Sequence, residues 1–360
     1  MTIQIFGEER AQRYNRALKR CPYARANELL PIFILLYGEQ LRDSTLVELA
    51  SGTGYLTDIL DHLVKRVIRV DKSPEMLTKL HTDTDLVYAD LREVSEKIDK
   101  TLQVDAITCL AALHHVCEIV DGKAQSQESE LSQFQTIESW IRLLAPGGKL
   151  VLIDVGVPDL PSNADDSLSV PIERYYRRKQ EMYSQTYFSI DIQFLKAIRD
   201  AKPEYFIGHY IEQLIAREVD TISLASIIEH QQLRGQIQPD KIIAVDFFDE
   251  IVANFSIDGH IAHFLREDHL RTALKQSGLK KTLVTCLPTT WTFKSEAEAV
   301  WFVRELFALG EGSVLSPEDM VVHADYERVK GYINQFLGMT TEGETVYVNW
   351  QLLFAYGEKG

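Results

Sequence analysis

The stretch Val47-Glu48-Leu49-Ala50-Ser51-Gly52-Thr53-Gly54 decides the fold. It begins in an apolar segment, Thr45–Ala50, that is typical of a buried strand, and it ends where a helical pattern starts. Small residues at a strand-to-helix turn let a ligand approach the backbone closely. In open α/β sheets ligands bind at the carboxyl ends of the strands. The stretch therefore predicts a ligand-binding turn at the edge of a sheet.

The turn does not fit the common phosphate-binding patterns. Gly52 and Gly54 match the first two glycines of a dinucleotide fingerprint, but Thr57 occupies the third position. No Gly-Lys-Ser/Thr follows, which excludes a phosphate loop. Glu48 lies immediately before the turn, where a carboxylate would repel a pyrophosphate and would attract a ligand that carries an ammonium group.

Two further carboxylates end the next predicted strands. Asp71 ends the strand 66–71, 23 residues after Glu48, and Asp90 ends the strand 86–90. Because the carboxyl ends of parallel strands meet at one edge, these side chains are expected near the turn. A carboxylate in the place of Asp71 can accept hydrogen bonds from both ribose hydroxyls. A simple role in capping the strand ends is the alternative.

Strands and helices alternate through the first half of the chain and predict a parallel sheet covered on both faces. The alternation stops after Val157 and returns near Leu265. We therefore expect a core of residues 1–157 and 265–360 with a mainly helical cap, 158–264, inserted between its parts. The predicted strands are 45–50, 66–71, 86–90, 104–110 and 149–155, with later strands in 279–293 and 345–356. The predicted helices are 54–65, one from Pro74, 92–100, 132–144, 265–277 and 296–309.

Composition narrows the classes of function. The chain has 38 Lys and Arg against 53 Asp and Glu, and the net charge of −15 disfavours broad binding to nucleic acid. Its four cysteines form no CxxC pair, so neither a thiolate zinc site nor a disulfide scaffold is expected. The first ten residues carry charges and lack an apolar core, so no signal peptide is expected. The apolar run 29–37 is too short to span a bilayer, so a buried helix is expected there. The scattered cysteines lead us to expect a cytoplasmic location.

Taken together, the motifs resemble those of the class I S-adenosylmethionine (SAM)-dependent methyltransferases. Glu48–Gly54 resembles their glycine motif, with Ala50 in place of its first core glycine. The resemblance covers about residues 10–156 and, more weakly, 265–357. The other matching segments are Asp71 with Lys72–Leu77, Ala89–Leu91, Asp105–Val116 and Leu143–Asp154. It implies a seven-stranded, doubly wound, Rossmann-like sheet whose last strand is antiparallel, with SAM as cofactor and S-adenosylhomocysteine as product.

The resemblance also implies roles for single residues. Glu48 would read the methionine amino group, Asp71 would hold the ribose, and Asp90 would accept a hydrogen bond from the adenine amino group. Met76 would pack on the adenine. The remaining residues predicted at the cofactor are Tyr14, Arg25, Ala50, Gly52, Gly54, Lys72, Leu91, Leu110 and Ala111. For Tyr14 and Arg25, a plain surface position on a helix is the alternative.

Fewer sequence features identify the residues that bind the methyl acceptor. His115 is the candidate general base, because it follows the fourth strand and so faces the transferred methyl group in this architecture. A structural role is the alternative for this histidine. The candidate acceptor-binding residues are His114, Tyr175, Tyr176, Arg178, Tyr183 and Trp291. His260 and His263 would share one side of a helix, but they match no known metal signature, so no metal is expected.

The sequence therefore predicts a SAM-dependent methyltransferase that methylates an oxygen or nitrogen of a small molecule, in a biosynthetic pathway. Two alternatives stay open: methylation of a protein or tRNA, and a SAM-binding protein that catalyses another reaction, such as a cyclisation. No nucleic-acid or membrane partner is expected. The oligomeric state, with a homodimer among the options, is not determined by the sequence.

Overall fold

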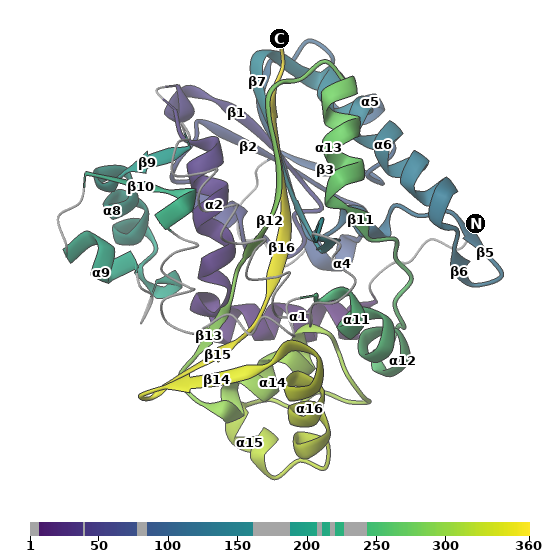
Figure 1. Ribbon diagram of the computed structural model, residues 1–360, viewed down its shortest axis with the longest axis vertical. Helices are drawn as coiled ribbons and strands as arrows, with labels where there is room; N and C mark the ends of the chain where they lie inside the picture. The colour runs from purple at the N-terminus through teal and green to yellow at the C-terminus, as the bar shows by residue number, and fades with distance from the viewer. Residues whose placement is uncertain are drawn as a thin grey trace.

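The computed structural model describes residues 7–38, 40–77, 85–160, 188–206, 211–216, 220–226 and 243–360. A seven-stranded sheet forms its centre (Figure 1). Its strands are β1 (Thr45–Leu49), β2 (Arg66–Asp71), β3 (Leu86–Tyr88), β4 (Val104–Leu110), β7 (Leu144–Asp154), β12 (Lys280–Pro288) and β16 (Gln351–Glu358). They lie in the order β12-β16-β7-β4-β1-β2-β3. This confirms the predicted Rossmann-like sheet.

The direction of each strand also agrees with the prediction. Strands β3, β2, β1, β4 and β7 run parallel, whereas β16 pairs antiparallel with both β7 and β12. Strands β1, β4 and β7 are buried almost throughout, because each has neighbours on both sides and helices over both faces. Their near-continuous apolar sequences suit strands that are buried on both faces.

Helices cover the two faces of the sheet. In Figure 1, α2 lies on one side of it, and α5, α6 and α13 lie on the other. Every residue of α2 is buried, which confirms the helix expected from the apolar run. The helices that cover the sheet or connect its strands are α2 (Ala26–Leu36), α3 (Thr57–Leu60), α4 (Pro74–Leu77), α5 (Val94–Lys97), α6 (Ser126–Leu143) and α13 (Glu267–Gln276).

Two helices differ in length from the prediction. α3 is one short turn, because the residues beside it form hydrogen-bonded turns and not a continuous helix. α6 begins at Ser126, before the predicted helix start at residue 132. The residues before it form a hairpin of β5 (Ile119–Val120) and β6 (Lys123–Ala124).

The C-terminal part carries a second small sheet and its own helices. Strands β13 (Trp291–Phe293), β15 (Thr345–Val348) and β14 (Met339–Glu342) form it, in the order β13-β15-β14. The predicted strand 345–356 is thus two strands in two different sheets. The helices here are α14 (Glu296–Leu306), α15 (Pro317–Val321), α16 (Tyr326–Tyr332) and a π-helical turn (Ile333–Leu337). α1 (Glu8–Arg20) crosses between this part and the central sheet in Figure 1.

The described residues of the expected cap form two groups. The first contains β9 (Ser189–Asp191), α8 (Ile192–Ala201), α9 (Ile211–Ala216) and β10 (Thr221–Ser223), and β9 pairs with β10. The second contains α11 (Val245–Phe247), a π-helical turn (Phe248–Val252) and α12 (Ala253–Phe255). A short parallel pair, β8 (Gly156–Val157) with β11 (Leu265–Arg266), joins the two ends of the insertion.

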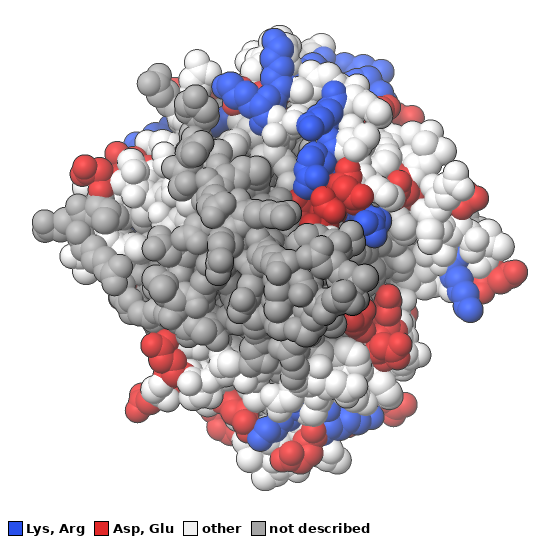
Figure 2. All heavy atoms as spheres, in the orientation of Figure 1, with Lys and Arg blue, Asp and Glu red and all other residues white. Residues whose placement is uncertain are grey.

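The described surface carries charges of both signs. On the face drawn in Figure 2, Lys and Arg side chains lie among Asp and Glu side chains. No helix in the described part of the chain combines the length and hydropathy that a bilayer-spanning segment needs.

Candidate cofactor and acceptor site

One cavity lies at the carboxyl ends of β1, β2 and β4, where the sequence predicted it. The predicted cofactor residues that line it are Tyr14, Arg25, Glu48, Ala50, Gly52, Asp71, Lys72, Met76, Asp90, Leu91, Leu110 and Ala111. On the acceptor side it is lined by His114, His115 and Trp291. Gly54 is not among the lining residues. Tyr175, Tyr176, Arg178 and Tyr183 lie outside the described residues, so their predicted role is not examined by the structure.

The glycine turn uses left-handed backbone at three alternate positions. Ala50 has φ +51°, Gly52 +55° and Gly54 +85°. The left-handed φ of Gly52 disfavours any other residue there, and a Cβ would also lie 3.3 Å from Cε of Met76, so that side chain would have to shift. Gly54 shapes the turn, since its N–H donates to the carbonyl of Ser51 at 2.9 Å. Ala50 adopts a conformation that costs a non-glycine residue about 1–2 kcal/mol, so its departure from the family pattern brings backbone strain.

Asp71 is built into this turn. Its two carboxylate oxygens accept the backbone N–H groups of Gly52, at 2.8 Å, and of Ser73, at 2.9 Å. Burial raises the pKa of Asp71, and these two hydrogen bonds oppose the shift. The carboxylate therefore holds the turn in shape while it lines the cavity, where it can still accept hydrogen bonds from a ligand.

Glu48 is buried at the end of β1. The hydroxyl of Thr57 donates a hydrogen bond to it. Burial raises the pKa of Glu48 to about 8, and the Thr57 hydrogen bond counters only part of this shift. Near neutral pH the carboxyl is mostly protonated in the absence of a cation. A ligand ammonium group next to it would favour the ionised form.

Asp90 and Ala111 complete the predicted cofactor end. The Asp90 carboxylate accepts the N–H of Arg92 at 3.1 Å and lies 3.7 Å from Nζ of Lys72. Ala111 follows β4 with φ +54°, and its N–H donates to the carbonyl of Ile153 at 2.7 Å. The chain thus turns sharply beside the cavity and presents backbone atoms there.

Arg25 belongs to a buried polar group. Its guanidinium donates to both carboxylate oxygens of Glu28 and to the hydroxyl of Tyr14. The indole N–H of Trp291 donates to the same Glu28, at 2.6 Å. These contacts fix Tyr14, Arg25 and Trp291 in relation to one another. Arg25 is therefore not a surface residue, as one alternative had it, but a buried part of the cavity wall.

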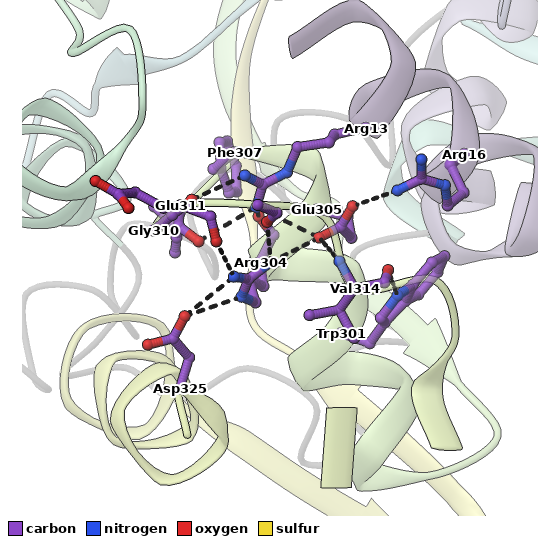
Figure 3. Close-up of polar contacts among 12 residues, drawn as sticks. Arg13, Arg16, Trp301, Arg304, Glu305, Phe307, Gly310, Glu311, Val314 and Asp325 are labelled. Atoms are coloured by element: carbon purple, nitrogen blue, oxygen red, sulfur yellow. Dashed lines mark hydrogen bonds and ion pairs between the residues drawn. The ribbon is translucent and has the colours of Figure 1, made fainter. Parts of the chain in front are cut away.

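A second buried network holds α1 against α14 (Figure 3). The carboxylate of Glu305 lies 2.8 Å from Arg304, 2.9 Å from Arg16 and 3.3 Å from Arg13. The Arg13 guanidinium also donates to the carbonyls of Gly310, Leu309 and Arg304. Because the side chains of Arg13, Arg304 and Glu305 are fully buried, the network ties α1 firmly across the cavity.

Aromatic side chains wall the far end of the cavity, and sequence analysis missed most of them. We call Phe248, Trp291, Phe307 and Trp350 the aromatic chamber. Trp350 lies 4.3 Å from Trp291, 5.8 Å from Phe248 and 5.9 Å from Phe307 between ring centroids. Arg10 of α1 also lines the cavity. No local motif marks these residues, because they come from four distant segments.

Three histidines lie at the same end. His114 and His115 follow β4 in a 3₁₀ turn (Leu113–His115), and His260 comes from the segment after α12. Burial, followed by the neighbouring histidine charges, lowers the pKa of His115 well below 6.5. Burial likewise lowers the pKa of His260. Both rings are therefore neutral at pH 7. His260 and His263 do not share a helix face as expected, because the residues around them form no helix.

Comparisons with known proteins point to one family. Residues 47–152 match the family model described as a methyltransferase domain. A search of curated proteins gives no match. Among solved structures, YcgJ of Bacillus subtilis is 11% identical, with TM-score 0.40, over 93% of this chain and 97% of that one. The N-methyltransferase NodS of Bradyrhizobium japonicum, in complex with S-adenosylhomocysteine, is 17% identical, with TM-score 0.31, over 39% and 65%.

Residues 47–152 therefore contain a methyltransferase domain. The strand order of the sheet agrees with the class I SAM-dependent architecture that the sequence motifs resemble. SAM is accordingly its cofactor, and the protein is an enzyme of methyl transfer. The contacts of each predicted residue with SAM stay predictions.

Proposed function

We propose that the enzyme transfers the methyl group of SAM to an oxygen or nitrogen of a small acceptor held in the aromatic chamber. The observation that carries this proposal is the continuity of one cavity from Glu48, Asp71 and Asp90 to the chamber. Phe248, Trp291, Phe307 and Trp350 each expose 7% of their surface or less, so the chamber is internal. An internal chamber suits a small, largely apolar acceptor and excludes water from the transfer.

The residues that line the cavity also indicate which parts of the chain select the acceptor. Among the described residues of 158–264, only Phe248 and His260 line the cavity, whereas the C-terminal part contributes Trp291, Phe307 and Trp350. We therefore propose that acceptor selection is shared between the insertion and the C-terminal part. The division into a core and an inserted cap, 158–264, itself stays a proposal.

The role of His115 as general base stays a prediction. The position of His115 at the cavity supports a role as base. The lowered pKa of His115 argues against that role, because such an imidazole holds an abstracted proton poorly at pH 7. Methyl transfer from a sulfonium does not require a base when the nucleophile is already neutral and well aligned.

Release of S-adenosylhomocysteine from SAM tests the proposal. Purified enzyme should form it with small hydroxylated or amino-bearing aromatic acceptors. Protein or tRNA fractions should give no release. Formation with macromolecules alone would contradict the proposal. Tight SAM binding without any transfer, across an acceptor panel, would favour a non-methylating reaction.

Asp71→Ala is the matched variant for the cofactor end. Loss of charge-assisted hydrogen bonds to the ribose should cost about 1.5–3 kcal/mol, which is about 10- to 100-fold in SAM affinity. Because Asp71 also accepts the Gly52 N–H, Asp71→Asn serves as the control that keeps an acceptor oxygen for the turn. Calorimetry with unchanged affinity in a folded Asp71→Ala protein would overturn the ribose assignment.

A further inference from the structure

Three imidazoles converge at the acceptor end of the cavity. Ligand nitrogens of His114, His115 and His260 all lie within 4.8 Å of one another. The ring centroids are 4.1 Å apart for His114 and His115, 5.4 Å for His114 and His260, and 5.1 Å for His115 and His260. We call these residues the histidine cluster. Two of them are neighbours in the chain, and the third comes from a segment 145 residues later.

Two rings of the cluster are held by hydrogen-bond partners. Nδ1 of His114 lies 2.5 Å from a carboxylate oxygen of Asp154, and the other Asp154 oxygen accepts the His114 backbone N–H at 2.9 Å. His115 forms a hydrogen bond with the backbone of Ile261. Metal-binding histidines typically donate their second N–H to a carboxylate or a backbone carbonyl in this way. The arrangement leaves the opposite ring nitrogen of His114, Nε2, for a ligand.

The third ring is held by packing. His260 lies 4.9 Å from Phe248 between ring centroids, and its Nε2 is buried without a hydrogen-bond partner among the described residues. A buried nitrogen of this kind is costly unless something binds it. A metal ion would give this nitrogen a partner, because imidazole is a common metal ligand.

The two segments that form the cluster are bonded together. The N–H of His263 donates to the carbonyl of His114 at 2.9 Å. The side-chain amide of Gln133 donates to the carbonyls of Leu113, at 3.2 Å, and of His263, at 2.9 Å. These bonds hold the His260 segment over the 3₁₀ turn, so the cluster is organised before any ligand arrives.

We propose that His114, His115 and His260 bind one divalent transition-metal ion of the zinc type. Three imidazoles with further positions open are the usual ligand set of a catalytic zinc ion. The cavity lies on the open side of the cluster, so an acceptor oxygen or nitrogen can occupy a remaining position. The binding of the ion does not rest on the proposed function. The ion would orient the acceptor and lower the pKa of its hydroxyl group. His115 would then be a ligand and not a base.

Metal titration of the full-length, tag-free chain tests the proposal without SAM or acceptor. After removal of metal with a chelator, Zn²⁺ in calorimetry and Co²⁺ in visible absorption should each show one tight equivalent. The visible absorption band of the bound Co²⁺ should have the molar absorptivity that is typical of a four- or five-coordinate ion. His260→Ala should weaken binding at least about tenfold, and Asp154→Asn about 10- to 100-fold.

His62→Ala is the matched control, because His62 is exposed and remote from the cluster in the chain. It should leave both titrations unchanged. Circular dichroism and thermal unfolding check that each variant is folded. If a His114→Ala variant fails to fold, the metal titration of His260→Ala tests the site instead. Absence of the tight equivalent in the wild type, or its persistence in folded His260→Ala, would overturn the metal site. Neither result depends on methyl transfer.

Discussion

At the residue scale, the cofactor end depends on carboxylates whose ionisation burial has changed. Glu48 and Asp71 both have raised pKa values, and Glu48 reaches about 8. A buried carboxyl that is neutral when alone and ionised beside a cation couples ligand binding to proton release. The sequence predicted both residues as ligand contacts, but their raised pKa values come mainly from burial in the folded structure.

SAM affinity should therefore depend on pH through Glu48. The methionine ammonium group favours the ionised carboxyl, so affinity should fall by up to about tenfold for each pH unit below 8. Calorimetry in buffers of different ionisation enthalpy should show proton release on binding near pH 7. In Glu48→Gln the slope should vanish. Equal affinity at pH 6 and pH 8 in the wild type would refute the contact.

The raised pKa of Glu48 also makes the free energy of unfolding depend on pH. The folded-state pKa of Glu48, about 8, exceeds the ordinary 4.5, so between these values the native state holds a proton that the unfolded state has lost. The contribution of Glu48 to the free energy of unfolding is thus greatest below pH 4.5. It is lost as the pH rises toward 8.

At the element scale, buried ion pairs hold α1 against α14 in addition to apolar packing. Glu305 is shared by Arg13, Arg16 and Arg304 (Figure 3). Arg10 and Tyr14, which line the cavity, lie on the same helix. The network therefore links the integrity of the C-terminal helices to the shape of the cofactor cavity.

Glu305→Gln should destabilise the protein by about 3–5 kcal/mol, because it leaves two fully buried arginines without their shared charge. SAM affinity should fall as well, since α1 loses its anchor. Urea unfolding measures the first effect and calorimetry the second. As a control, Glu318→Gln removes an exposed pair with Arg20 and should cost about 0–1 kcal/mol. Similar losses in both variants would contradict the role of the network.

At the scale of the whole molecule, the C-terminal strand lies inside the central sheet. β16, made of residues Gln351–Glu358, lies between β7 and β12 inside the sheet. Trp350, just before it, walls the aromatic chamber together with Trp291 and Phe307. Residues 351–357 are consequently buried in the core.

Truncation before Gln351 should prevent folding, although every residue predicted at the cofactor remains. Removal of β16 leaves the facing edges of β7 and β12 unpaired and exposes apolar side chains of both strands. We expect an insoluble chain, or one without a cooperative unfolding transition in denaturant. Removal of the exposed Gly360 alone should have little effect. A truncated chain that binds SAM like the full-length protein would disprove this account.

Local patterns were enough to predict the sheet and the cofactor end of the cavity. The observed bounds of β2 and β4 equal the predicted ones, because a short apolar run is a short-range signal. The division of residues 345–358 between β15 and β16 was not predictable, because it depends on which distant strands each pairs with. The start of α6 at Ser126 was missed because polar residues on an exposed helix face look like a loop.

By itself the sequence predicted the methyltransferase domain, the cofactor and the turn of Ala50, Gly52 and Gly54, because backbone conformation and strand ends are encoded by neighbouring residues. Only the tertiary structure brought His260 beside His114 and His115, and Phe248 beside Trp350. It also buried Glu48 and so raised its pKa. The contacts of His260 and of Trp350 join segments separated by a hundred or more residues. Such pairings are decided by the packing of the whole chain and leave no local pattern.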